Sequence, residues 1–133
     1  MALIAAALYW GEGTKKVSKA NERLAFVNSD PKMIVVFLKF VREVLQVPEE
    51  KIRAGIHLYD ATTDTQGKKY WSRVTKLPPD RFWIVRQVSR ASKGIRNRHS
   101  LPFGTLVVKV SDRRLFHYIL GMIEEIKVSC GVE

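Results

Sequence analysis

The stretch LAFVNSDPKMI at residues 24–34 decides the fold, because it joins a strand directly to a helix. Leu24 and Phe26 would share one side of a strand, since successive side chains alternate between the two faces. Asp30 can accept hydrogen bonds from the first free amides of a helix, and Pro31 suits the first helical position. We therefore expect a strand, a cap and a helix in direct succession.

The helix that begins at Pro31 is expected to run to about Gln46 and to be mostly buried. Its apolar side chains cover a broad face and leave only a narrow polar stripe. The apolar set consists of Met33, Ile34, Phe37, Leu38, Val41, Val44 and Leu45. Such a helix is scaffold rather than a binding site.

Downstream of this helix, apolar alternation predicts a half-buried antiparallel strand at residues 52–59, with Arg53 and His57 on its outward side. The remaining expected elements are a polar linker at 60–67, a short helix at 68–76, strands at 82–89 and 105–110 separated by a basic loop at 90–102, and a helix at 112–127 capped by Ser111 or Asp112.

The N-terminal region adds a helix at residues 2–12 and a hairpin, whose strands at 15–19 and 23–28 flank a turn at 20–22. The complete order predicts one α+β domain over residues 1–133. In this arrangement an antiparallel sheet carries helices on one face and leaves the opposite face open.

The charge of the chain predicts a nucleic-acid partner. There are 23 Lys and Arg against 13 Asp and Glu, which gives a formal charge of +10 and a pI near 10.0. The charge is clustered, since residues 81–100 hold six cations and no acid, whereas residues 111–133 carry a net −1. Clustered charge of this size favours nucleic acid. No basic amphipathic helix and no apolar run of spanning length occurs, so we expect no membrane partner.

Composition and motifs exclude several other classes. Cys130 is the single cysteine, which rules out an intramolecular disulfide and a cysteine-rich zinc site and predicts a reducing, cytoplasmic location. The N-terminal apolar run lacks the positively charged leader of a signal peptide. No phosphate-binding loop or dinucleotide fingerprint is present, so we expect no small-molecule cofactor. The histidines at 57, 99 and 117 are scattered, and only His99, in the basic loop, is expected to contact phosphate.

Glu12 is the acidic residue that can carry chemistry, because it follows a helix between two glycines. A single carboxylate holds Mg²⁺ poorly, but two copies of it across a two-fold axis, together with DNA phosphates, would suffice for phosphodiester hydrolysis. The alternative is a solvated acid at a helix end. Ala7 and Gly11 lie four residues apart on one helix face, which suits either close packing of two helices or burial against the chain's own sheet.

The run AAALYWGEG at residues 5–13 resembles the LAGLIDADG motif, position for position. The strand, Asn-Ser-Asp-Pro and helix sequence at 24–34 and the segments YWSRVT at 70–75 and GTLVVKV at 104–110 are also similar to the LAGLIDADG-type homing endonuclease-like family. The chain departs from the motif at Ala7, at the bulky pair Tyr9 and Trp10, and at Glu12, where an Asp is usual. The extra helix at 68–76 is a further departure.

The resemblance implies a homodimeric, Mg²⁺-dependent, site-specific endonuclease that cuts double-stranded DNA. Its saddle-shaped antiparallel sheet would straddle the duplex, Ala7 and Gly11 would lie in the dimer seam, and Glu12 would be the catalytic, metal-binding acid. Cations of the sheet and loops would supply phosphate affinity, while Asn97 and some arginines would reach base edges. The expected DNA-binding residues are Lys15, Lys16, Ser18, Lys19, Arg53, Arg86, Lys93, Arg96, Asn97 and Arg98.

Two alternatives use the same basic surface. Some relatives of this family have lost cleavage, so the chain is alternatively a DNA-binding protein or transcription regulator that does not cut. An RNA-binding role, such as assistance in splicing, is the third hypothesis, and it would show as a preference for single strands or for 2′-hydroxyl groups.

Overall fold

The computed structural model describes residues 2–13, 23–59, 62–86 and 103–132. Four α-helices and four strands lie in this part of the chain: α1 (Ala2–Glu12), β1 (Leu24–Asn28), α2 (Pro31–Lys39), β2 (Ile52–Leu58), α3 (Asp64–Thr75), β3 (Phe82–Arg86), β4 (Thr105–Val110) and α4 (Arg113–Ser129). A π-helical turn, Phe40–Val44, continues α2. Two short 3₁₀ turns, Glu49–Lys51 and Pro79–Arg81, lead into β2 and β3.

The four strands form one mixed sheet in the order β1-β4-β2-β3. β4 is antiparallel to both of its neighbours, but β2 and β3 are parallel. The prediction of a wholly antiparallel sheet is therefore wrong at this pair. The reason is that α3 lies between β2 and β3 along the chain, and a helical crossover brings two strands into the sheet in the same direction.

The caps predicted from the sequence are present at α2 and α4. The Lys32 amide donates to Asp30 Oδ1 over 2.8 Å, and Pro31 is the first residue of α2. At α4 the cap is Asp112, which accepts from the amides of Arg114 and Leu115. Side-chain acceptors of this kind satisfy helix amides that have no partner inside the helix.

Helix α3 begins earlier than the predicted 68–76, because a capping box starts it inside the predicted polar linker. The Gln66 amide donates to Thr63 Oγ1 over 3.1 Å, and the Thr63 amide donates to Gln66 Oε1 over 3.0 Å. The helix ends where Lys76 adopts a left-handed conformation with φ of 65°. Reciprocal capping of this kind is a helix start signal.

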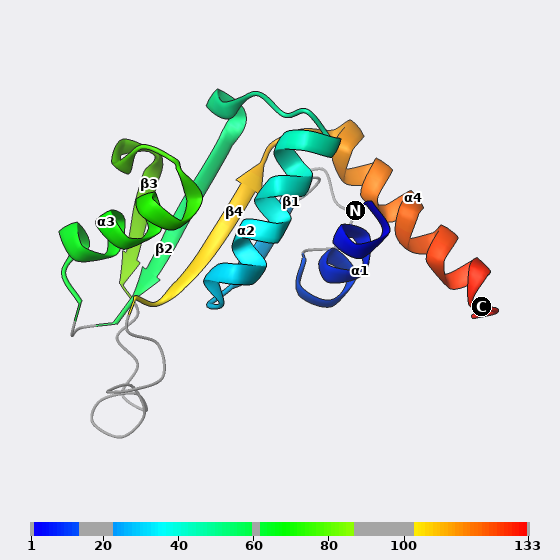
Figure 1. The fold of residues 1–133 in the computed structure, drawn as a ribbon, viewed down its shortest axis with the longest axis horizontal. Coiled ribbons are helices and arrows are strands. Elements are labelled where there is room, and N and C mark those ends of the chain that lie inside the picture. Colours follow the sequence, from blue (N-terminus) through cyan, green and yellow to red (C-terminus); the bar gives the residue numbers. More distant parts are fainter. Residues whose placement is uncertain (1, 14–22, 60–61, 87–102, 133) are drawn as a thin grey trace, which may run out of the picture.

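Helices α2 and α3 lie against one face of the sheet, and α1 packs at the edge strand β1 (Figure 1). Helix α4 packs along α1 and then extends away from the sheet (Figure 1). Side chains of alternate strand positions point to the helices and form the core with Phe37 and Phe40. This arrangement confirms a helical layer on one face and leaves the other face of the sheet without a covering helix among the described elements.

Several predictions fall outside the described residues. These are the first hairpin strand at 15–19, its turn at 20–22, the end of the predicted strand at 87–89 and the basic loop at 90–102. None of the helices in the described ranges combines the length and apolar character needed to cross a bilayer.

Candidate nucleic-acid interface

The outer face of the sheet is basic and aromatic. Strand alternation and the pairing registers place ten described side-chain positions on it. They are Ala25, Val27, Arg53, Gly55, His57, Trp83, Val85, Thr105, Val107 and Lys109. No Asp or Glu occurs among these positions, so the charge of this face comes from Arg53 and Lys109 without a neutralising acid on the same strands.

Two of these cations oppose each other directly. Arg53 of β2 pairs with Lys109 of β4 in the antiparallel register. Burial lowers the pKa of Lys109, and the positive charge of Arg23, just before β1, lowers that pKa further. Like charges opposite one another on a sheet destabilise it. A polyanion bound across this row would remove the repulsion, and the face is therefore suited to phosphate.

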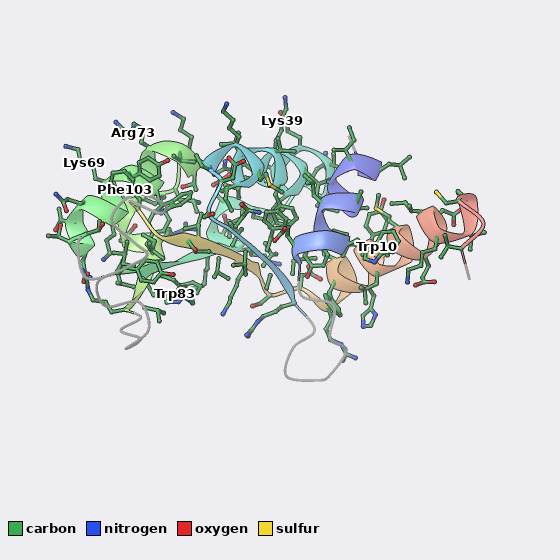
Figure 2. The ribbon with its side chains drawn as sticks, turned by 90° about the horizontal axis from the view of Figure 1, so that it is seen from below. Trp10, Lys39, Lys69, Arg73, Trp83 and Phe103 are labelled. Carbon is green, nitrogen blue, oxygen red and sulfur yellow. The ribbon has the colours of Figure 1, made fainter. Side chains whose placement is uncertain are left out.

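Trp83 lies flat beside this row of charge. In the register it opposes Gly55, and a Cβ at Gly55 would overlap the indole atoms Cε2, Cζ2 and Nε1 of Trp83. The indole therefore rests on the glycine backbone. Lys109 Nζ lies 5.1 Å from the centre of the same ring. Figure 2 shows Trp83 on the side of the sheet away from Lys39 and Arg73, which belong to the helical layer.

Arg86 lies on the other side of the sheet from Arg53. It opposes the buried Leu58 in the parallel register, so its side chain starts on the helix side. Its guanidinium donates to the carbonyl oxygens of Tyr59 and Thr62 and pairs with the Asp64 carboxylate at 2.6 Å. Arg86 thus ties the end of β2 to the start of α3, and its side chain does not belong to the outer face.

Glu12 lies at the end of α1, beside the edge strand. Gly13 forms an isolated antiparallel bridge with Phe26, and the hydroxyl of the buried Tyr9 accepts from the Ala25 amide over 3.2 Å. These contacts hold the end of α1 against β1 and leave Glu12 exposed. The last turn of α1 contains no basic residue, so the negative helix end and the carboxylate together favour a cation there.

The oxygen donor of Glu12 suits Mg²⁺, but a single carboxylate leaves most of the metal's coordination positions to other ligands. Among the described residues no cluster of three or more potential metal ligands occurs. The fit to a divalent metal therefore depends on a second Glu12, from another copy of the chain, and on oxygen atoms of the substrate.

The exposed face of α1 is apolar and includes two small residues. Ala5, Ala6 and Tyr9 are buried against the chain's own core, whereas Ala7 and Gly11 are exposed. A Cβ at Gly11 would meet no atom within 4 Å. Ala7 and Gly11 therefore do not pack against the chain's own sheet, and both are exposed in the single chain. Leu3 and Ile4, each 62% exposed, extend this face.

The structure brings together only part of the predicted interface. Arg53 lies on the outer face as expected, while Lys15, Lys16, Ser18, Lys19, Lys93, Arg96, Asn97 and Arg98 lie outside the described residues. Sequence reasoning missed Lys109, Trp83 and Arg23. The alternation rule that placed Arg53 outward would have placed Lys109 and Trp83 outward as well, had it been applied to residues 82–86 and 105–110.

Comparisons with protein-family models, with curated proteins and with solved structures found no match to this chain.

Proposed function

We propose that this chain is a homodimeric endonuclease that binds double-stranded DNA on the outer face of its sheet and cuts it with the help of Mg²⁺ at Glu12. The observation that carries the DNA-binding part is the like-charge pair of Arg53 and Lys109 on a sheet face whose described strand positions hold no acid. Such a pair is stabilised when phosphates bind across it.

Glu12 gives the proposed cleavage its metal ligand. Two copies of Glu12, brought together where two α1 helices meet, would hold the divalent ion between them and next to the DNA backbone. The ion, when bound, supplies Lewis-acid stabilisation of the reacting phosphodiester. Arg53 and Lys109 would bind neighbouring phosphates and hold the duplex in register, which is the role of backbone contacts in DNA recognition.

The exposed apolar face of α1, which includes Ala7 and Gly11, supports the proposed dimer. A substitution at Gly11 tests this contact. Replacing Gly11 by Leu is expected to weaken dimerisation by about five- to 150-fold, because overpacking a close helix contact costs about 1–3 kcal/mol and tenfold corresponds to about 1.4 kcal/mol. Sedimentation at several concentrations measures the change. The folded monomer should not be destabilised, since Leu is a better helix former than Gly and the site is open.

The matched control for the dimer is Gly121→Leu. Gly121 lies on α4, is exposed, and also has no atom within 4 Å of an added Cβ. We expect this variant to dimerise like the wild type. Equal dimerisation of the two leucine variants and the wild type would contradict a seam at α1.

DNA binding without cleavage is the second candidate function. It is favoured by the separation of the two features, since Arg53 and Lys109 lie on the sheet whereas Glu12 belongs to a helix end. The positive charge of the outer sheet face could bind DNA without the Glu12 carboxylate.

The decisive experiment is a selection from a randomised duplex DNA library in the presence of Mg²⁺, with cut molecules and bound but uncut molecules recovered separately. Enrichment of cut sites with two-fold character supports the endonuclease. Enrichment of bound sites with no cut molecules leaves the non-cleaving DNA-binding protein. Failure to enrich either class would refute both functions.

Neutralising the like-charge pair is expected to weaken duplex binding. The double variant Arg53→Gln and Lys109→Gln should lose at least tenfold in affinity near 0.1 M salt. The slope of log affinity against log salt should fall by up to about two per subunit, because each lost phosphate contact removes roughly 0.9. Titration of a labelled duplex at several salt concentrations measures both quantities.

The control for this variant is Lys32→Gln with Lys39→Gln. Both lysines are exposed on α2, in the helical layer on the opposite side of the sheet. This variant removes the same charge but should keep most of the affinity and of the salt slope. An equal loss in the two double variants would mean that net charge alone, and not the sheet face, determines binding.

A further inference from the structure

Trp83 offers a flat aromatic surface of a kind that phosphate binding alone does not require. Its indole rests on the backbone of Gly55, which is the one residue type that leaves room for it there. Trp83 is only partly buried. The ring is thus held against the sheet, and part of it is accessible from the open side, where a ligand would displace or pair with the Lys109 ammonium.

One cation lies over this ring, and a second lies on the neighbouring strand of the same face. Lys109 Nζ lies 5.1 Å from its centre, and Arg53 opposes Lys109 across the adjacent strand pair. A ligand that matches both features must combine an aromatic plane with negative charge at short spacing. A nucleotide has this combination, since its base can stack on the indole while its phosphate contacts the neighbouring ammonium or guanidinium.

An unpaired base fits this surface better than a paired one. In a duplex both faces of an internal base are covered by its neighbours, whereas a single strand can turn one base face onto a protein ring. We propose that Trp83 is a stacking platform for an unpaired base, by which the outer sheet face binds single-stranded nucleic acid. The proposal shares with the proposed function only the premise that this face binds nucleic acid.

The test compares a ten-nucleotide oligothymidylate with a decamer of the same backbone that carries abasic sites. Wild type is expected to bind the base-bearing strand roughly ten- to hundredfold more tightly, because stacking contributes most of the difference. In Trp83→Leu this preference should fall to less than threefold. Trp83→Phe should keep part of it, since it retains a ring. Circular dichroism of each variant establishes that it is folded.

Fluorescence gives a second readout that a purely structural role of Trp83 would not produce. Stacking of a base on Trp83 should quench its emission. Trp71 is buried, whereas Trp10 on α1 is 37% exposed, so the quenching that belongs to Trp83 is the part that disappears in Trp83→Phe. The abasic strand should not cause this part of the quenching. Equal affinity of wild type for the two decamers, or full preference retained in Trp83→Leu, would overturn the platform.

Two further arms separate this proposal from the proposed function. Comparison of oligothymidylate with oligouridylate distinguishes DNA from RNA as the source of the unpaired base. The affinity for a matched duplex is expected to differ less than threefold between wild type and Trp83→Leu. If Trp83→Leu loses as much affinity for the duplex as for the single strand, Trp83 has no role specific to unpaired bases. Quenching by the single strand without duplex binding would refute only the proposed function, and duplex binding without base preference would refute only the platform.

Discussion

Glu12→Gln is expected to eliminate DNA cleavage while duplex affinity stays within about twofold of the wild type. The substitution keeps the size of the side chain but replaces an anionic oxygen by an amide nitrogen. Charge stabilisation by a metal is worth several kcal/mol, and each 1.36 kcal/mol corresponds to about a factor of ten. The expected loss in cleavage rate is therefore roughly a thousandfold or more, measured on a site recovered by selection.

The control for this prediction is Glu125→Gln. Glu125 is exposed on α4, so this variant also removes one surface carboxylate. It should cut like the wild type. If Glu12→Gln cuts at the wild-type rate, Glu12 is not the metal ligand. If both Glu12→Gln and the wild type bind without cutting, the non-cleaving alternative is the function.

The second large effect concerns stability and lies at the centre of the aromatic core. Phe37 has no exposed surface, and its ring stacks on Phe26 with centroids 4.3 Å apart. It also contacts Tyr9 at 5.9 Å and Phe40 at 6.2 Å between centroids. Phe37 therefore joins α2 to both α1 and β1, and these contacts help to hold α1 against the sheet.

Phe37→Ala should lower the free energy of unfolding by about 3–5 kcal/mol, the usual cost of removing a buried phenylalanine side chain. Domains of this size are stable by roughly 5–15 kcal/mol, so the variant is close to the threshold of folding. Urea titration followed by circular dichroism measures the change. Because the stack includes Tyr9 of α1, the variant should also lose a contact that holds α1 in place.

Val35→Ala is the matched control on the same helix. Val35 is 45% exposed, and alanine is the better helix former, so the free energy of unfolding should change by less than about 0.5 kcal/mol. A cost at Val35 as large as that at Phe37 would contradict the assignment of the stability to the packing of the buried face of α2.

Much of the fold was predictable because its signals are local. The Asp30 cap with Pro31, the alternation of residues 52–58 and the apolar stripe of α4 each lie within a few residues of the element they specify. The sequence predicts the start of α3 too late, because the capping box at Thr63 and Gln66 is also a polar stretch that resembles a linker. Composition alone does not distinguish the two.

The candidate site was predictable only in part. The outward position of Arg53 follows from alternation, and Glu12 stands out as an acid between two glycines at a helix end. Arg86 has the same charge as Arg53, yet it pairs with Asp64, which lies twenty-two positions earlier in the chain. Only the parallel register of β2 and β3 brings these two residues together.

The sequence by itself determined that most of the described helices and strands form and where several of them begin, because caps, prolines and alternation act through hydrogen bonds and side-chain directions within one or two turns of the chain. Only the tertiary structure decided which strands are neighbours. It set β4 between β1 and β2, placed Lys109 opposite Arg53 and laid Trp83 on Gly55. Strand pairing joins residues far apart in sequence, and its free energy comes from the packing of whole faces rather than from any local signal.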